Sequence, residues 1–469
     1  MNAFVIAGTH SGSGKTTVTL ALMAFFTAKG LKVQPYKVGP DFIDPGLHTR
    51  ITGRVSRNLD GWMLTKDYNI SLFSWASRDA DMAIVEGVMG IYDGFGGKSE
   101  DGSTAQMAKW LGIPVILVID AKSMARSVAA LVHGFTTFDP GVNWGGIILN
   151  RVAGEGHFEY LRDALVSSLP HIPILGWIPR DDHISLPERH LGLVTVEESP
   201  LDREWINRAA EIVSKHIDIE KLISTTTVRT SPSSSPFSFE LQSDSGCNAP
   251  VNIAIARDAA FCFYYEDNLD FLRTFGARLS FFSPLAGETI PPDSDAVILW
   301  GGYPEMHIEK LTANKKFLKD LGRCFQDGIP IYAECGGLMT LSRFIEDWNG
   351  KKWPMAGILP FGTRMLKRRK ALGYVEVELT ERSMLGDEGT TIRGHEFHYS
   401  EICEEDKVSR LDTIYKVSRR KGDTPRREGY AVGNSIASYV HQHWGSNPHV
   451  PGNIVAFLRR RKQCQKQNP

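Results

Sequence analysis

Two groups of residues in this sequence have the types and spacing that chemistry requires. The first is the glycine-rich run Gly8-Thr-His-Ser-Gly-Ser-Gly-Lys15-Thr16-Thr17, which follows an apolar segment and precedes a helical pattern. In such a turn, backbone N–H groups face a phosphate, Lys15 reaches the β- and γ-phosphates, and Thr16 reaches Mg²⁺. We therefore predict a nucleotide-phosphate site that comprises Gly12, Gly14, Lys15, Thr16 and Thr17.

A triphosphate that carries a metal ion needs carboxylates beside it. Glu86 ends an apolar strand pattern, and Asp41 and Asp44 follow the preceding strand pattern. The carboxyl ends of strands in an α/β sheet bind ligands, and oxygen ligands suit Mg²⁺. The alternative is that Asp41 and Asp44 only shape turns. Asn150, at another strand end, either reads the adenine edge or forms a turn.

The second group surrounds a cysteine. Cys335 lies between a short apolar strand and a helix in the run Gly328-Ile-Pro-Ile-Tyr-Ala-Glu-Cys-Gly-Gly-Leu-Met. A tight turn of this kind exposes a thiol at a helix N-terminus, where the helix dipole favours the thiolate. Two histidines, His441 and His443, are candidate bases, and either could pair with the thiol. Backbone N–H groups of the Trp300–Glu305 run are candidate donors to an oxyanion.

The other cysteines are best interpreted as structural. Six cysteines lie far apart with no CxxC pair, which argues against a zinc site and against a disulfide framework. A small buried hydrophobic role is therefore the expectation for five of them. These are Cys247, Cys262, Cys324, Cys403 and Cys464.

The elements that must position both groups alternate between apolar strands and helices, which is typical of a parallel α/β sheet. We expect strands at 4–8, 32–38, 82–86, 114–120, 145–150 and 174–178, and then at 251–256, 296–300, 329–333 and 375–379. Residues 224–250 are rich in Ser, Thr and Pro and read as a linker. The predicted organisation is a P-loop domain over 1–223, that linker, a second α/β domain over 251–458, and a frayed basic tail over 459–469.

Length and composition agree with this division. A chain of 469 residues exceeds one ordinary core, and its 42% hydrophobic and 23% charged residues are those of a globular protein. A formal net charge of −1 gives no reason to expect a nucleic-acid partner. We also expect no membrane partner and a cytoplasmic location, because no long apolar run and no basic leader is visible.

The motifs together resemble the cobyrinate a,c-diamide synthase family. The resemblance rests on an ordered set that spans nearly the whole chain, and the longer phosphate loop also looks like that of dethiobiotin synthetase. The set is Val38-Gly-Pro-Asp-Phe-Ile-Asp-Pro, Glu86-Gly-Val-Met-Gly, Leu186-Pro-Glu-Arg-His-Leu-Gly-Leu, Gly301-Gly-Tyr-Pro-Glu, Glu334-Cys-Gly-Gly-Leu-Met, Gly394-His-Glu-Phe-His-Tyr-Ser and Tyr439-Val-His.

This resemblance implies a dethiobiotin-synthetase-like ATP domain joined to a class I, triad-type glutamine amidotransferase domain. It implies Cys335 as nucleophile and His441 as base, with Thr16, Asp41 and Glu86 at Mg²⁺ and Asp44 at the substrate carboxylate. Gly302 and Gly336 are then the expected oxyanion donors. Many triad amidotransferases carry a glutamate two residues after the histidine; His443 stands there, so the third member is open.

The implied reaction is ATP-dependent amidation of the a and c carboxylates of cobyrinic acid, a tetrapyrrole-type acid, with L-glutamine as the ammonia donor. Sirohaem, hydrogenobyrinate and nickel-sirohydrochlorin are alternative acceptors, and a homodimer is expected from the family alone. A P-loop ATPase or nucleotide sensor without amidation is the alternative from another class. The basic stretches 367–370, 419–421 and 426–427 either meet substrate carboxylates or are solvated loops.

Overall fold

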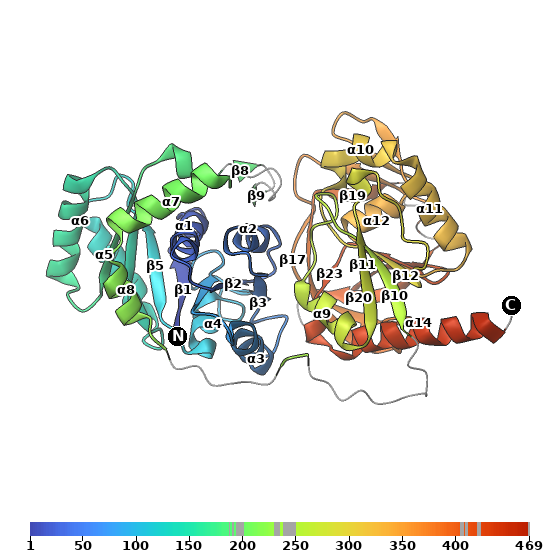
Figure 1. Ribbon diagram of the computed structural model, residues 1–469, viewed down its shortest axis with the longest axis horizontal. Helices are drawn as coiled ribbons and strands as arrows, with labels where there is room; N and C mark the ends of the chain where they lie inside the picture. Colours follow the sequence, from blue (N-terminus) through green and yellow to red (C-terminus); the bar gives the residue numbers. More distant parts are fainter. Residues whose placement is uncertain are drawn as a thin grey trace. The chain divides into compact units, whose positions relative to one another are not determined.

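The chain forms two compact units, Met1–Pro236 and Phe237–Pro469, in a computed structural model (Figure 1). The structure describes residues 1–186, 188–189, 192–193, 201–228, 235–237, 250–403, 408, 411–419 and 424–467. Cys247, Lys421 and most of the predicted linker lie outside the described residues, as does part of the motif that begins at Leu186.

The first unit is built on a seven-stranded parallel sheet in the order β3-β2-β4-β1-β5-β6-β7. Its strands are β1 Asn2–Gly8, β2 Val33–Val38, β3 Arg57–Leu59, β4 Met82–Glu86, β5 Val115–Asp120, β6 Trp144–Val152 and β7 Ile174–Pro179. A separate two-stranded hairpin comprises β8 Glu188–Arg189 and β9 Gly192–Leu193. The helices are α1 Lys15–Ala28, α2 Ile43–Thr52, α3 Lys66–Ser77, α4 Thr104–Leu111, α5 Ser127–Phe138, α6 Glu155–Ser168, η1 Asp182–Ile184, α7 Arg203–His216 and α8 Ile219–Thr225.

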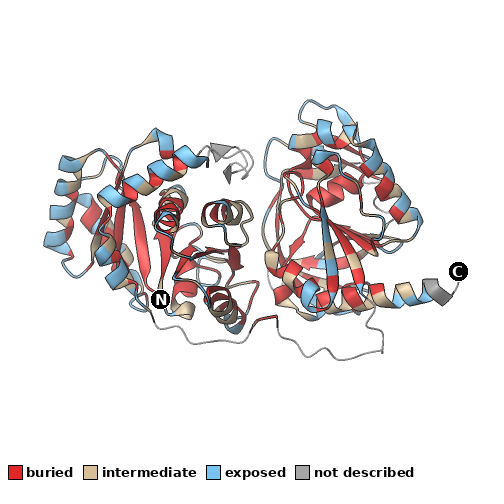
Figure 2. Ribbon diagram, in the orientation of Figure 1, coloured by how far each residue is buried: buried red, intermediate tan, exposed pale blue. Residues whose placement is uncertain are grey.

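Both faces of this sheet are buried. Phe4 and Ile6 of β1 join a core that also contains residues of α1, α2 and α7. Val5, which alternates with them and points to the other face, is also fully buried. Continuous apolar strands of this kind are expected where helices cover both faces of a parallel sheet. Figure 2 shows the strands as the most buried part of the unit.

The second unit carries a ten-stranded sheet in the order β11-β10-β12-β13-β22-β21-β20-β17-β18-β23 and a four-stranded sheet in the order β15-β14-β16-β19. Strands β11, β10, β12, β13 and β22 are parallel neighbours, and the pairs beyond β22 are antiparallel where the chain meanders. The parallel half therefore has the α/β character predicted from sequence.

The strands of this unit are β10 Val251–Ala256, β11 Ala277–Phe282, β12 Ala296–Leu299, β13 Ile331–Glu334, β14 Phe344–Glu346, β15 Lys352–Pro354, β16 Gly362–Met365, β17 Ala371–Leu379, β18 Thr391–His398, β19 Ser400–Cys403, β20 Asp412–Ser418, β21 Arg426–Val432, β22 Ser435–Ser438 and β23 His441–Gln442. The helices are α9 Glu266–Thr274, η3 Pro284–Ala286, η4 Pro304–His307, α10 Ile308–Ala313, α11 Lys315–Gln326, α12 Gly336–Leu341, η5 Trp444–Ser446 and α14 His449–Gln467.

Two expectations about this unit are corrected. Helices were expected between the later strands, but the segment between β14 and β23 is mostly antiparallel strands. The end of the chain was expected to fray, but α14 continues to Gln467. Its basic residues hold it in place, because Arg459 donates to Phe275 O, Arg461 donates to Asp327 O, and Lys462 forms an ion pair with Asp295.

Candidate active site

The glycine-rich run forms a tight loop between β1 and α1. Gly12 and Gly14 have φ angles of 85° and 90°, a region that side chains with a Cβ adopt rarely. A Cβ on Gly14 would also lie 1.9 Å from the Asn150 amide nitrogen. That nitrogen donates to the Ser13 carbonyl oxygen across 3.0 Å. Asn150 thus contacts the loop itself, and its predicted contact with adenine stays a prediction.

Lys15 opens α1 and folds back over the loop, where its Nζ donates to the His10 carbonyl oxygen across 3.2 Å. Burial, followed by the nearby Lys37 ammonium, lowers the pKa of Lys15 to about 8. A nearby anion stabilises the charged form of a buried ammonium group. These features of Lys15 favour the binding of a phosphate at the loop.

Glu86, at the end of β4, is the centre of a buried polar network. Thr16 Oγ1 donates to its Oε1 across 2.5 Å, Lys37 Nζ lies 3.0 Å from the same oxygen, and His48 Nε2 lies 2.7 Å from Oε2. Burial opposes ionisation of Glu86, yet its pKa lies well below the usual range because these three partners favour the carboxylate. The site therefore contains a fixed negative charge beside the phosphate loop.

The structure separates the roles of Asp41 and Asp44. The buried Asp44 carboxylate forms an ion pair with Lys37 at 2.5 Å, so it belongs to the Glu86 network. Asp41 instead accepts hydrogen bonds from the backbone N–H groups of Ile43 and Asp44 and caps the start of α2. Among the described residues, no three His, Cys, Asp or Glu side chains are grouped as a metal site. Burial, followed by the Asp41 and Glu86 carboxylates, raises the pKa of Asp44, so the three carboxylates influence one another and their role at Mg²⁺ stays a prediction.

Sequence reasoning missed Lys37 and His48. Lys37 is a charged residue in a strand whose residues are all buried, and such a charge requires partners. That signal was available from the strand pattern around Val33–Val38. His48 had no such signal, because only the fold brings α2 next to Glu86.

Mg²⁺ fits Thr16 and Glu86 in part. Their two oxygens lie side by side, and Mg²⁺ commonly takes one or two protein oxygens together with phosphate and water. Lys37 competes for the same Glu86 oxygen, and Asp41 is directed to its helix cap. The donor set thus suits a metal ion that arrives with a nucleotide rather than a resident ion.

The thiol of the second unit lies on a strained turn between β13 and α12. Cys335 has a φ of 45° and a ψ of −99°, and its N–H donates to the Ser438 carbonyl oxygen across 2.7 Å. A non-glycine residue in such a conformation costs about 1–3 kcal/mol and is commonly found at active sites. The turn therefore fixes Cys335 at the end of the parallel strands.

The expected resting thiolate is not what the surroundings favour. Burial raises the pKa of the Cys335 thiol, and the nearby Glu305 carboxylate adds to that effect. Helix α12 has only six residues, which limits any opposing effect of its dipole. Burial and the Glu305 carboxylate both favour the protonated form of the thiol.

Close contacts at two glycines place both His441 and the thiol turn against the loop that contains Gly301 and Gly302. A Cβ on Gly301 would lie 2.2 Å from His441 Cε1, and a Cβ on Gly336 would lie 3.1 Å from the Gly302 nitrogen. The predicted oxyanion residues Gly302 and Gly336 are thus neighbours, and His441 packs on the same loop. His441 is buried, and burial, followed by His395 and His398, lowers its pKa to about 3.

His443, the other candidate base, is used differently. Its Nδ1 accepts a hydrogen bond from the Gly445 N–H across 3.1 Å, which caps η5. Its Nε2 lies 3.8 Å from an Asp267 carboxylate oxygen. Both ring nitrogens therefore face the chain's own groups, which favours His441 as the candidate base.

Strand β18 forms a wall of the thiol site. The Phe397 carbonyl oxygen lies 3.9 Å from Cys335 Sγ. The preceding residue, Glu396, is buried and pairs with Arg419 and Arg426. Two of the basic stretches thus have a carboxylate partner in the protein, and Lys370 of the third pairs with Glu401.

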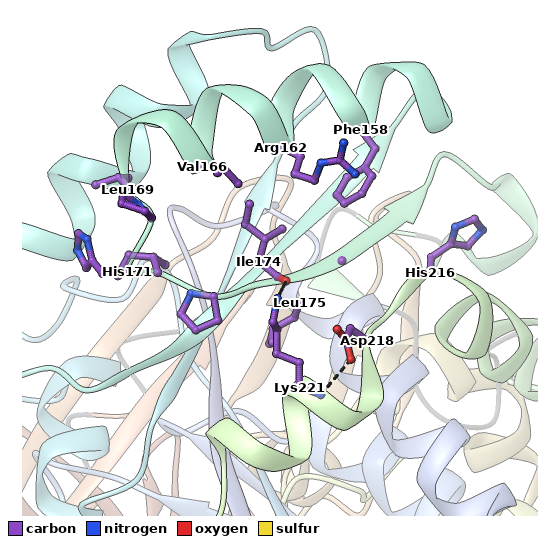
Figure 3. A pocket seen from close by; sticks show the side chains of 14 residues that line it. Phe158, Arg162, Val166, Leu169, His171, Ile174, Leu175, His216, Asp218 and Lys221 are labelled. Carbon is purple, nitrogen blue, oxygen red and sulfur yellow. Dashed lines mark hydrogen bonds between the residues drawn. The ribbon is translucent and has the colours of Figure 1, made fainter.

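A hollow described on the first unit is lined by none of these residues. A cavity of about 490 Å³ lies between α6 and the edge strand β7, lined by Phe158, Arg162, Ile174 and His216 among others (Figure 3). It contains none of the predicted site residues. The described helices also include none that is both long and apolar enough to cross a membrane.

These two arrangements define the class of protein: a P-loop nucleotide-binding domain combined with a glutamine amidotransferase domain. Residues 4–194 match the family described as the CobQ/CobB/MinD/ParA nucleotide binding domain. Residues 252–449 match the CobB/CobQ-like glutamine amidotransferase domain.

The chain belongs to the cobyrinate a,c-diamide synthase family. It is 44% identical to the cobyrinate a,c-diamide synthase of Syntrophotalea carbinolica over 97% of this chain and 98% of that protein. It is 41% identical to the Salmonella typhimurium enzyme of the same name, over 98% of each chain. It is also 41% identical to the Streptococcus sanguinis enzyme, over 98% and 99%. The family predicted from the motifs is thus confirmed.

Solved structures add little to this assignment. A chain of the PurLQS structure from Thermotoga maritima matches 44% of this chain and is covered over 99% of its own length. Its identity is 14% and its TM-score is 0.34, so the likeness is too weak to support a conclusion.

Proposed function

We propose that this protein uses ATP and glutamine to amidate the a and c carboxylates of cobyrinic acid in cobalamin biosynthesis. The observation that carries this proposal is the similarity over nearly the whole chain to enzymes named cobyrinate a,c-diamide synthase. Both chemical requirements of such a reaction have candidate residues in this chain. A carboxylate must be activated, and ammonia must be released from glutamine.

The first unit is proposed to activate the carboxylate. The loop from Gly12 to Thr17 would hold the phosphates of ATP, and Lys15 would neutralise charge that develops on the transferred γ-phosphoryl group. Thr16 and Glu86 would hold Mg²⁺, which lowers the cost of that charge when bound. The Lys37–Asp44 pair lies next to Glu86 and would position the substrate carboxylate. The product of this step is an acyl phosphate, which ammonia can attack.

The second unit is proposed to release the ammonia. Cys335 would attack the side-chain amide of glutamine, with His441 as the base and the Gly302 and Gly336 N–H groups as oxyanion donors. Water would then hydrolyse the thioester and give glutamate. Surroundings that favour the protonated thiol make such a base necessary, because the thiolate is the nucleophile.

The decisive experiment compares acceptors. Cobyrinic acid, hydrogenobyrinate, sirohaem and nickel-sirohydrochlorin are each incubated with the protein, ATP, Mg²⁺ and glutamine, and products are measured by mass spectrometry. Two carboxylates converted to amides on cobyrinic acid is the expected result. Conversion of another acceptor alone would keep the chemistry and replace the substrate.

A P-loop ATPase or nucleotide sensor is the alternative of another class. It predicts ATP hydrolysis that no tetrapyrrole acid stimulates and no dependence on Cys335. A homodimer and a cytoplasmic location remain predictions, which light scattering of the purified protein and cell fractionation test.

A further inference from the structure

The residue directly before the nucleophile is a buried carboxylic acid that faces His441. Glu334 ends β13 and is 1% exposed. Its Oε2 lies 3.7 Å from His441 Nδ1, and this is the ring nitrogen that a triad carboxylate contacts in general. The position two residues after His441, where a glutamate was sought by sequence, is filled by His443.

The carboxylate is held in place through its other oxygen. Tyr332 OH donates to Glu334 Oε1 across 2.6 Å, and the Gln442 N–H donates to the same oxygen across 3.0 Å. Gln442 follows His441 in the chain, so one carboxylate contacts two consecutive residues of β23. These two donors fix the orientation that directs Oε2 toward the imidazole.

A second carboxylate–histidine pair in this unit provides a comparison. Asp267 and His443 are also buried, and they are separated by a similar 3.8 Å. His443 Nδ1, however, accepts from the Gly445 N–H, so that ring is a cap of η5. The His441 ring instead packs on the Gly301 loop beside the thiol turn. The two pairs thus match in burial and distance, but differ in their place relative to Cys335.

We propose that Glu334 is the third member of the thiol site: a positioning residue that orients His441 and stabilises its protonated form. This inference rests on the proposed function, because it concerns the glutamine-hydrolysing step. His441 takes the Cys335 proton on Nε2 while the sulfur forms its bond to the amide carbon. The same proton then goes to the departing nitrogen as the C–N bond breaks and ammonia leaves. Glu334 passes no proton to Cys335 or to the departing nitrogen in this sequence.

The buried surroundings explain why Glu334 and His441 act together. Burial raises the pKa of Glu334 to about 8 and lowers the pKa of His441 to about 3, so each charge by itself is disfavoured. His395 and His398 of β18 also disfavour a charged His441. An imidazolium beside a carboxylate relieves both costs, since opposite charges in a buried site stabilise each other. The proton transfer from Cys335 therefore needs Glu334.

The test uses Glu334→Gln in the full-length enzyme, with Asp267→Asn as the matched control. Glutamine hydrolysis and ammonia-dependent amidation are measured from pH 5 to 9. We expect Glu334→Gln to lower kcat for glutamine about 100-fold, the lower range of a lost acid–base function, with little change in KM. The acid limb of the rate profile should move to lower pH, because His441 loses the charge that favours its protonation. Ammonia-dependent amidation and the Asp267→Asn variant should behave like the wild type.

A merely structural role would lower stability without moving the acid limb. Wild-type kcat and an unmoved acid limb in Glu334→Gln would overturn this inference and leave the proposed function intact. A wild-type enzyme that does not hydrolyse glutamine, or a Cys335→Ala variant that does, would instead refute the proposed function.

A second measurement decides the case if Glu334→Gln does not fold. The ¹⁵N shifts of the His441 ring in the wild-type enzyme, assigned by comparison with His441→Gln, report which nitrogen carries the proton. A proton on Nδ1 is expected. A proton on Nε2 alone would overturn the inference, since Glu334 would then have no donor to orient.

Discussion

Thr16 Oγ1 and Glu86 Oε1 are joined by a hydrogen bond of 2.5 Å, which connects the first turn of α1 to the end of β4. The residue assigned to the phosphate loop thus contacts the residue assigned to the metal. We expect Thr16→Ala to lower ATP-dependent amidation at least about 100-fold, because the metal ion that helps to position the phosphates would lose a ligand. Glutamine hydrolysis should persist. Thr16→Ser, which keeps the hydroxyl, should retain most of the activity; equal loss in both variants would contradict a role for the hydroxyl.

Gly12 and Gly14 allow the effect of a positive φ angle on stability to be distinguished from the effect of a steric clash. Gly12 and Gly14 have similar φ angles, but only the Cβ of Gly14 would meet a neighbour, the Asn150 amide. Gly12→Ala should cost about 1 kcal/mol of unfolding free energy. Gly14→Ala should cost about 2–4 kcal/mol, because the Asn150 amide must also move. Chemical denaturation of both variants measures the two losses of unfolding free energy. Equal losses would show that the Asn150 side chain can move away without an energetic penalty.

Asn150 has two possible roles that nucleotide selectivity distinguishes. Its amide donates to the Ser13 carbonyl oxygen, so Asn150→Ala should loosen the loop and weaken the use of ATP and GTP by the same factor. A contact with adenine would instead make ATP use fall more than GTP use. The ratio of kcat/KM for the two nucleotides is therefore the measurement. We expect that ratio to be unchanged.

Cys335→Ala should abolish glutamine-dependent amidation, while amidation with added ammonium chloride continues. The reason is that only the glutamine reaction needs a nucleophile on the turn after β13. Amide formation on the tetrapyrrole acid is followed by mass spectrometry with each nitrogen source. Cys324→Ala is a suitable control, because Cys324 is buried in α11 as a core residue. Glutamine-dependent activity in Cys335→Ala would refute the assignment.

Because the carboxyl group of Glu305 is buried, we expect the free energy of unfolding to depend on pH. Burial raises its pKa to about 7 in the folded protein, from an ordinary value of 4.5. Between these values the unfolded chain releases the proton while the folded chain keeps it, so this group destabilises the fold as pH rises from about 4.5 to 7. Glu305→Gln lacks the effect. The variant should match the wild type near pH 4 and be more stable by roughly 1–3 kcal/mol at pH 8. Denaturation at both pH values provides the test.

The sequence was sufficient for the parts of the fold in which apolar strands are continuous. Strands such as Met82–Glu86 and Val115–Asp120 are buried on both faces, and their pattern is visible in one dimension. Strand β11 was missed because it lies at a sheet edge, where Arg278, Ser280 and Phe281 are exposed. Edge strands carry too few buried residues to produce the pattern.

The sites divide in the same way. Lys15, Thr16 and Cys335 lie in local motifs, where the sequence neighbours determine the geometry. The contacts of Glu86 with His48, and of Glu334 with His441, join residues that are distant in sequence and meet only in the fold. A local sequence pattern cannot predict contacts between residues that are distant in the chain. The burial of Cys335, which disfavours the predicted thiolate, likewise follows from the whole fold and not from the local motif.

The hydrogen bond from Cys335 N–H to the Ser438 carbonyl oxygen has a consequence for synthesis on the ribosome. Strand β13 becomes a central strand only when β22 pairs beside it, and β22 is translated long after β13. His441 is translated later still. By contrast, Ala3 of the first unit bonds to Thr226, so that unit can close around the midpoint of translation. All residues of the first unit are thus translated well before His441, the candidate base of the thiol site, so the two sites become complete at different stages of synthesis.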